Sequence, residues 1–142
     1  MGDAPVWVLD TNVVVSGLLS PAGPPGRLVD ALLDRRLTLA FDDRIEIEYR
    51  EVLARPKLGI PAIRREALLA ILQFHVHVTA RPWPFTTPPD VDDAVFLEVA
   101  LQTSARTVVT GNARHFPPRC RGPVVVLSPR EALERLAGLE LT

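Results

Sequence analysis

The chain has 142 residues, a formal net charge of −1, 47% hydrophobic residues and a single cysteine. This length favours one domain over residues 1–142, and the hydrophobic fraction is too high for a disordered chain. The lone Cys120 excludes an internal disulfide framework and a multi-cysteine zinc site. The near-neutral charge excludes a global basic field, so any binding of nucleic acid would have to come from local patches.

Neither a membrane span nor a secretion signal is expected. No apolar run approaches the roughly 18 residues that a transmembrane helix needs. The start of the chain has no basic segment, and its apolar run at 6–9 is cut short by Asp10, so it does not resemble a signal peptide. We therefore expect a cytoplasmic protein with no membrane partner.

Strands and helices are expected to alternate along the chain. The first half predicts a buried strand at 6–9, a segment at 13–20 that fits helix or strand, a loop at 21–26, a helix at 27–36, a strand at 38–41 and a helix at 43–54. The second half predicts a helix at 63–73, a strand at 74–79, a loop at 82–89, a helix at 92–103, strands at 107–110 and 124–127, and a last helix that Ser128 caps. This alternation indicates a three-layer α/β/α fold with a central parallel sheet of four to five strands.

Acidic and amide side chains follow three of the predicted strands. Open parallel sheets bind ligands beyond the carboxyl ends of their strands, so we expect these residues to share one edge of the sheet. They are Asp10, Thr11 and Asn12 after the first strand, Asp90, Asp92 and Asp93 after the third, and Thr110, Gly111 and Asn112 after the fourth.

Asp93 is the most informative of these residues. On a helical wheel it lies near the centre of the apolar stripe that contains Phe96 and Leu97, while Asp92 points about 100° away. A carboxylate that faces the core is costly to bury unless it is paired or binds a metal, although an acidic residue here also favours the helix dipole. Asp10 leaves a similar choice between a site residue and a local cap or turn.

The helix expected at 43–54 offers further carboxylates. Glu46 and Glu48 both flank its apolar stripe, and the wheel does not choose between them; a solvated charged face is the simpler interpretation. His115 either packs in its loop or contacts a phosphate, and no catalytic histidine or cysteine is expected near the carboxylates. Convergent carboxylates without such partners favour a hard cation, Mg²⁺ or Mn²⁺, which serves phosphoryl chemistry.

Four blocks of sequence in a specific order cover most of the chain. They are residues 8–17 (VLDTNVVVSG), 48–58 (EYREVLARPKL), 90–97 (DVDDAVFL) and 109–117 (VTGNARHFP). In this order and spacing they resemble the motifs of the PIN-domain family. Within that family, the chain is similar to the prokaryotic proteins described as toxins of toxin–antitoxin pairs.

The resemblance implies a metal-dependent endoribonuclease that hydrolyses phosphodiester bonds in RNA. Asp10, Glu48 and Asp93 match the acidic positions that hold Mg²⁺ or Mn²⁺, which favours Glu48 over Glu46. The residues that would orient the ligands or contact the substrate are Thr11, Asn12, Asp92, Thr110, Asn112, Arg55 and Arg114. The implied partners are RNA and a cognate antitoxin protein, with a homodimer as a further option.

Asn112 departs from the family pattern, because many members carry an aspartate at this position. The neutral amide removes one anionic ligand, which leaves single-metal and substrate-assisted two-metal chemistry both open. It also favours the main alternative, a non-catalytic module of the same fold that binds RNA or protein. A receiver-type or phosphatase domain would need an aspartate in place of Asn12 or a phosphate-binding lysine, and the only lysine is Lys57 on another segment.

Overall fold

The computed structural model describes residues 3–141, which form five strands and six α-helices joined by loops and 3₁₀ turns. The strands are β1 (Val6–Leu9), β2 (Thr38–Phe41), β3 (Val76–His77), β4 (Thr107–Val109) and β5 (Val125–Leu127). The helices are α1 (Thr11–Leu19), α2 (Pro24–Leu33), α3 (Asp43–Leu53), α4 (Ala62–Ile71), α5 (Ala94–Leu101) and α6 (Pro129–Glu140). The domain was expected over 1–142, and residues 1, 2 and 142 lie outside the described residues. The first two of these also belong to the segment that was compared with a signal peptide.

The strands form one parallel sheet in the order β3-β2-β1-β4-β5. The chain moves outward from β1 to β2 and β3 on one side and then returns to β4 and β5 on the other. The switch point therefore lies between β1 and β4, where Val8 pairs with Val108 and Leu9 with Val109. This confirms the expected parallel α/β sheet and sets its strand number at five.

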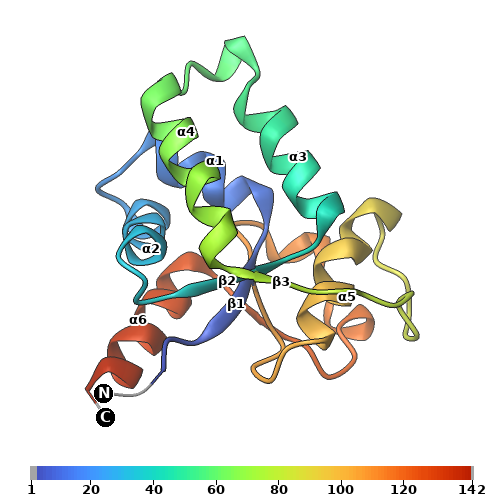
Figure 1. Ribbon diagram of the computed structural model, residues 1–142. Coiled ribbons are helices and arrows are strands. Elements are labelled where there is room, and N and C mark those ends of the chain that lie inside the picture. Colours follow the sequence, from blue (N-terminus) through green and yellow to red (C-terminus); the bar gives the residue numbers. More distant parts are fainter. Residues whose placement is uncertain (1–2, 142) are drawn as a thin grey trace.

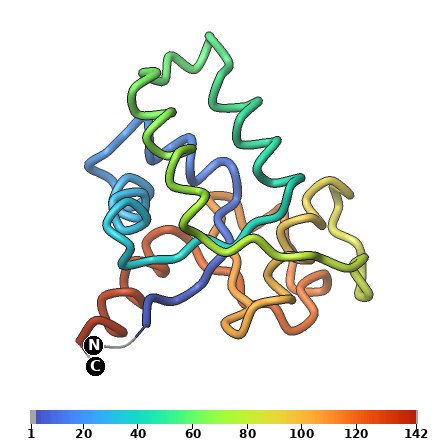
Figure 2. The backbone as a smooth tube through the Cα atoms, viewed as in Figure 1, coloured from blue at the N-terminus to red at the C-terminus, as the bar shows by residue number. Residues whose placement is uncertain are grey.

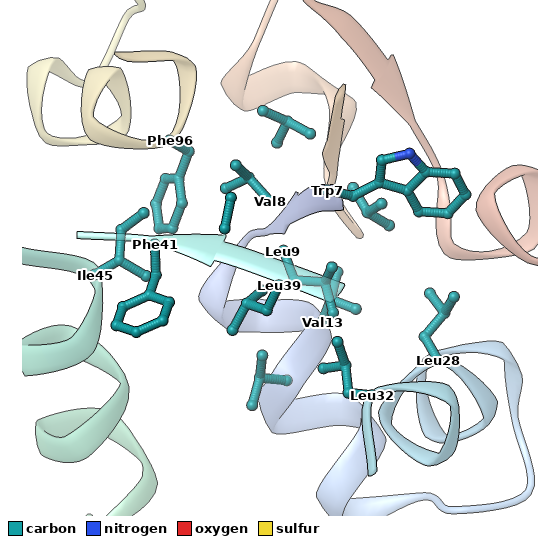
Figure 3. Packing of buried hydrophobic residues seen from close by; sticks show 14 of the residues in the cluster. Trp7, Val8, Leu9, Val13, Leu28, Leu32, Leu39, Phe41, Ile45 and Phe96 are labelled. Carbon is teal, nitrogen blue, oxygen red and sulfur yellow. The ribbon is translucent and has the colours of Figure 1, made fainter. Parts of the chain in front are cut away.

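Helices cover both faces of the sheet, as the three-layer interpretation predicted (Figure 1). Helix α5 packs against β1, β2 and β4, while α2 packs against α1 and α6. Figure 3 shows Phe96 of α5 on one side of β1 and β2, and Val13 and Leu28 of α1 and α2 on the other. Helices α3 and α4, the green part of the tube in Figure 2, extend away from the sheet. The segment that connects them contains the 3₁₀ turn Pro56–Leu58.

Residues 13–19 of the segment expected at 13–20 form a helix, which settles the ambiguity in the sequence. Helix α1 starts directly after β1 and buries Val13 and Val14 in the core. Gly17 lets α1 approach α2 closely, because a Cβ built there would lie 2.5 Å from Cγ2 of Val29. Tertiary packing therefore outweighs the weak helix propensity of the valines.

Helix α2 begins earlier than predicted. Residues 21–26 were expected to form a loop, but the helix starts at Pro24. Pro24 and Pro25 fit the first turn, where a helix needs no backbone N–H donor and the fixed φ of proline is suitable. Gly26 follows at a point where a Cβ would lie only 2.2 Å from the Pro21 carbonyl oxygen.

The strand expected at 74–79 was wrong in length, since only Val76–His77 pair with β2. Residues 72–74 instead form a 3₁₀ turn that continues α4. Nδ1 of His75 accepts a hydrogen bond from the Leu39 N–H at 2.8 Å, so an imidazole satisfies a backbone donor of β2. Burial lowers the pKa of His75, which keeps this acceptor unprotonated.

The helix expected at 92–103 is shorter in the structure, where α5 covers Ala94–Leu101. A 3₁₀ turn at Val91–Asp93 precedes it, and Asp90 caps this turn by accepting the Asp92 N–H at 3.0 Å. The two aspartates that follow Asp90 therefore lie just before the α-helix rather than within it. None of the helices within residues 3–141 is both long enough and apolar enough to cross a membrane.

Candidate active site

Asp10 lies between β1 and α1, at the carboxyl end of the sheet. Its backbone N–H donates to the Val109 carbonyl at 2.8 Å, which fixes it beside β4. Its Oδ2 accepts hydrogen bonds from Thr110 Oγ1 at 2.9 Å and from Asn12 Nδ2 at 3.2 Å. Burial raises the pKa of Asp10, although the hydrogen bond from Thr110 and the charge of His115 oppose that effect.

Asp93 faces the same edge from the turn before α5. Its side chain is 16% exposed, whereas the neighbouring Asp92 is exposed to solvent. Burial raises the pKa of Asp93 to about 6; His115 opposes the shift, and the nearby carboxylates, Asp10 foremost, add to it. A carboxylate with this pKa is held in surroundings that disfavour its charge, which is typical of functional sites.

His115 lies between these two carboxylates. Its Nδ1 is 3.9 Å from Asp10 Oδ2 and 3.9 Å from Asp93 Oδ2, too far for a direct hydrogen bond. That nitrogen is buried and has no hydrogen-bond partner within residues 3–141. His115 therefore lies next to both carboxylates, because the loop after β4 turns back as the 3₁₀ turn Ala113–His115.

Helix α3 brings Glu48 toward the same edge. Its Oε2 accepts a hydrogen bond from the hydroxyl of Thr11, the residue after Asp10. Glu46, which the helical wheel had left as an equal alternative, instead pairs with Arg50 at 3.0 Å. The structure therefore places Glu48, and not Glu46, beside the start of α1.

Hydroxyl and amide groups join the loops that follow β1 and β4. Oδ1 of Asn12 accepts the Gly111 N–H at 3.0 Å, and Thr110 Oγ1 accepts the Asn112 N–H at 3.1 Å. Asn112 caps the next turn and its Nδ2 lies 3.1 Å from Nε2 of His115. Asn112 therefore acts on the shape of the loop and on the histidine ring.

Tyr49 holds the backbone next to Asp10, and it was not among the residues predicted for the site. It is fully buried, and its hydroxyl donates to the carbonyl of Leu9, one residue before Asp10. Burial, followed by the negative charges of Asp10 and Glu48, raises the pKa of Tyr49 well above its usual value, so the phenol stays a donor. Its place in the apolar stripe of α3, next to Glu48, was the signal that could have indicated it.

Asp10, Glu48 and Asp93, with His115 beside them, form the acidic cluster of this site. The other residues expected at the site lie outside this cluster. Arg114 is exposed, and its backbone N–H donates to Asn112 Oδ1 at 3.2 Å. Arg55 is exposed and lies two residues beyond Leu53, the last residue of α3, whereas Glu48 lies in the middle of that helix. Asp92 shares with Glu48 the lining of a pocket of about 200 Å³.

Comparison with known proteins identifies the scaffold that carries these side chains. A family model described as the PIN domain matches residues 6–114, which contain Asp10, Glu48, Asp93 and Asn112. The chain belongs to the PIN domain family. An uncharacterized archaeal protein, MJ1680 of Methanocaldococcus jannaschii, is 30% identical over 108 residues, which cover 74% of this chain and 69% of that protein. PIN domains are generally nucleases, a class of hydrolase, and the acidic edge described above is therefore set in a nuclease-type fold.

The PIN domain implies a divalent metal ion, because nucleases of this fold typically use one. As they stand, no three His, Cys, Asp or Glu side chains within residues 3–141 gather closely enough to hold an ion. The donor set nevertheless fits, since Asp10 and Asp93 are hard oxygen ligands of the kind that Mg²⁺ and Mn²⁺ take. Both converge on Nδ1 of His115, which has no hydrogen-bond partner among the described residues. Asp10 is buried and the Asp93 side chain is only 16% exposed, and neither carboxylate has a full counter-charge.

Proposed function

We propose that this PIN domain is a metal-dependent endoribonuclease that hydrolyses phosphodiester bonds in RNA. The observation that carries the proposal is the convergence of Asp10 and Asp93 on one ring nitrogen of His115, with Glu48 close enough to act on the pKa of Asp93. These groups lie at the carboxyl ends of β1 and β4, beside the switch point where open α/β sheets bind their ligands. That PIN nucleases act on RNA supports RNA as the substrate.

Asp10, Glu48 and Asp93 are the residues that would hold Mg²⁺ or Mn²⁺. The chemistry that such an ion supplies is activation of water and neutralisation of charge on the phosphodiester. Thr110 fixes one oxygen of Asp10, and the Thr11 hydroxyl fixes Glu48. Asp10 and Glu48 are thus oriented before any ligand arrives, which limits the rearrangement that binding requires.

The remaining residues act on the loops or on the substrate. Asn12 joins the β1 and β4 loops through Gly111, and Asn112 holds His115 in place. Arg114 is exposed one residue before His115, where it can pair with a phosphate that flanks the bond to be cut. Arg55 lies beyond the end of α3 and would meet only RNA that extends along that helix.

The sequence resemblance supports a narrower role, that of the toxin in a toxin–antitoxin pair, with a cognate antitoxin and a second copy of the chain as partners. For such a toxin, expressing the chain alone should slow the growth of a bacterial host. The Asp10→Asn variant, expressed to the same level, should not. Equal growth of the two cultures would contradict the toxin role without contradicting the nuclease activity.

Glu48→Gln should weaken Mn²⁺ binding by about tenfold or more and slow RNA cleavage, since a neutral amide replaces an anionic ligand. The amide oxygen can still accept the Thr11 hydrogen bond, so the fold is not perturbed. Calorimetric titration of the metal-free protein measures affinity, and a labelled RNA with and without chelator measures cleavage. Glu46→Gln makes the same charge change on the same helix, where Glu46 pairs with Arg50, and should leave both quantities unchanged.

A non-catalytic module of the same fold that binds RNA or protein is the alternative. Asn112 favours it, because the amide leaves the site one anionic group short of the family pattern. A wild-type protein that binds no Mn²⁺ at roughly millimolar concentration, which is weak for a carboxylate site, would support this alternative if it also cut no RNA. Metal binding that depends on Glu48 would contradict it.

A further inference from the structure

A pocket of about 200 Å³ opens beside Glu48, between α3 and the start of α5. Drug-sized ligands occupy pockets of roughly 300–1,000 Å³, so this pocket suits a smaller ligand, such as one planar group of fused rings. Its lining residues are Arg44, Ile45, Glu48, Asp92, Val95 and Phe96. The proposed nuclease mechanism uses Glu48 and leaves the other five residues without a role.

The apolar part of the pocket can take the flat face of a base. Ile45 and Phe96 are buried, and Val95 between them in the lining is half-buried. Figure 3 shows Ile45 of α3 and Phe96 of α5 close to each other on neighbouring elements. Every nucleobase has an apolar face that packs on such a surface, so this part of the pocket favours a base without selecting one.

Arg44 brings hydrogen-bond donors to the pocket in a fixed orientation. Its Nη1 donates to Glu98 Oε1 at 2.7 Å, and its Nη2 and Nε face Asp42 Oδ2 at 2.6 and 2.8 Å. A guanidinium has five N–H groups, and these three contacts leave two for a ligand. Glu98 and Asp42 are both buried, so the arginine is held in place before a ligand binds.

Asp92 brings a free acceptor to the same pocket. Its backbone N–H donates to Asp90, but its carboxylate has no partner within residues 3–141. Asp92 is exposed, whereas Asp93, the next residue, is turned to the acidic cluster. The turn before α5 therefore presents one carboxylate to the proposed metal and the other to the pocket.

We propose that this pocket binds a guanine base of the RNA, beside the bond that is cut. Guanine has two adjacent N–H donors, N1 and N2, that match the carboxylate of Asp92, and two acceptors, O6 and N7, that match Arg44. Adenine and cytosine place an acceptor beside their amino group, and uracil has a single donor, so none of them offers Asp92 a pair of donors. The inference rests on the proposed function, because it names the base that the same site would read.

Cleavage of a random-sequence RNA pool in Mn²⁺ tests the inference. Sequencing of the cut ends should show guanosine at one fixed position relative to the cut. Replacing that guanosine by inosine, which lacks only the 2-amino group, should lower kcat/KM by about tenfold or more, since a hydrogen bond to a charged partner is lost. The Asp92→Asn variant should distinguish the two RNAs by no more than about twofold. Removing the Asp92 carboxylate and removing the 2-amino group abolish the same interaction, so the two effects do not add.

Asp90→Asn is the matched control. It makes the same change two residues away in the same turn, and asparagine can still accept the Asp92 N–H. Asp90 does not line the pocket, so this variant should keep the full preference for guanosine over inosine.

Binding of mononucleotides separates failure of this inference from failure of the proposed function. Guanosine 5′-monophosphate should shift the backbone NMR signals of Val95 and Phe96 in the metal-free protein, and inosine 5′-monophosphate should do so more weakly. If the protein binds guanosine 5′-monophosphate selectively but cuts no RNA, the result supports the guanine pocket and contradicts the proposed nuclease function. RNA cleavage without a guanosine preference would overturn the pocket and keep the nuclease. Tighter binding of a blocked arginine than of the guanosine nucleotide would also overturn it, in favour of a protein partner.

Discussion

Asp93→Asn should slow RNA cleavage by about a hundredfold to a thousandfold and, without metal, should raise thermal stability. The loss of activity is expected because Asp93 is one of the three carboxylates proposed to hold the ion, and the amide carries no charge. The gain in stability is expected because Asp93 is largely buried near Asp10 with only partial compensation from His115. One substitution should therefore move activity and stability in opposite directions.

The direction of the stability change follows from the pKa of Asp93. Burial raises this pKa to about 6 in the folded protein, above the ordinary value of 3.8. Between these two values the folded protein keeps a proton that the unfolded chain releases, so wild-type stability falls as the pH rises through this window. The variant lacks this loss. Its advantage in Tm should be a few degrees at about pH 8 and should fade by about pH 4.

Thermal unfolding without metal at the two pH values measures this effect. Asp92→Asn, an exposed neighbour with the same charge change, should leave the Tm unchanged at both. Adding Mn²⁺ should stabilise the wild type more than Asp93→Asn, since only a state that binds the ion gains from it. If Asp93→Asn were less stable than the wild type at pH 8 without metal, the carboxylate could not be an uncompensated charge in the fold.

Gly26→Ala should lower the free energy of unfolding by about 3 kcal/mol, at the upper end of the usual cost of overpacking. A Cβ at this position would lie 2.2 Å from the carbonyl oxygen of Pro21 and 2.4 Å from its carbonyl carbon. Both are backbone atoms, so no side-chain rotation relieves the contact. The start of α2 would have to move, and α2 packs against both α1 and α6.

Gly138→Ala provides the matched control in α6. No atom lies within 4 Å of a Cβ built at Gly138, so only backbone propensity changes there. Alanine is favoured over glycine in a helix by up to about 1 kcal/mol, and this variant should be slightly more stable than the wild type. Urea denaturation compares the two. Equal stability of Gly26→Ala and the wild type would mean that the backbone at Pro21 yields without cost.

Several features of the fold and site are visible in the sequence because they depend on local pattern. The strands at the centre of the sheet are covered on both faces, so β1 appears as a continuous apolar run. Asp93 is conspicuous because a carboxylate stands at the head of an otherwise apolar stripe, and the structure leaves its side chain only 16% exposed. The order of the four motifs pointed to the PIN domain, which the family comparison confirms.

Other features depend on contacts between residues far apart in the chain. Packing against α2 decides that residues 13–19 are helical, and the Thr11 hydroxyl places Glu48 rather than Glu46 beside the start of α1, a choice that the helical wheel left open. The position of His115 depends on how the loop after β4 turns back toward the β1–α1 junction.

The sequence by itself therefore determined the alternation of strands and helices and the residue types at the carboxyl edge of the sheet, since these follow from periodicity and spacing. Only the tertiary structure decided which carboxylates converge, which histidine they meet and which pocket Asp92 and Arg44 share. The physical reason is that burial and charge interactions act through space, between segments whose separation in the chain carries no local signal.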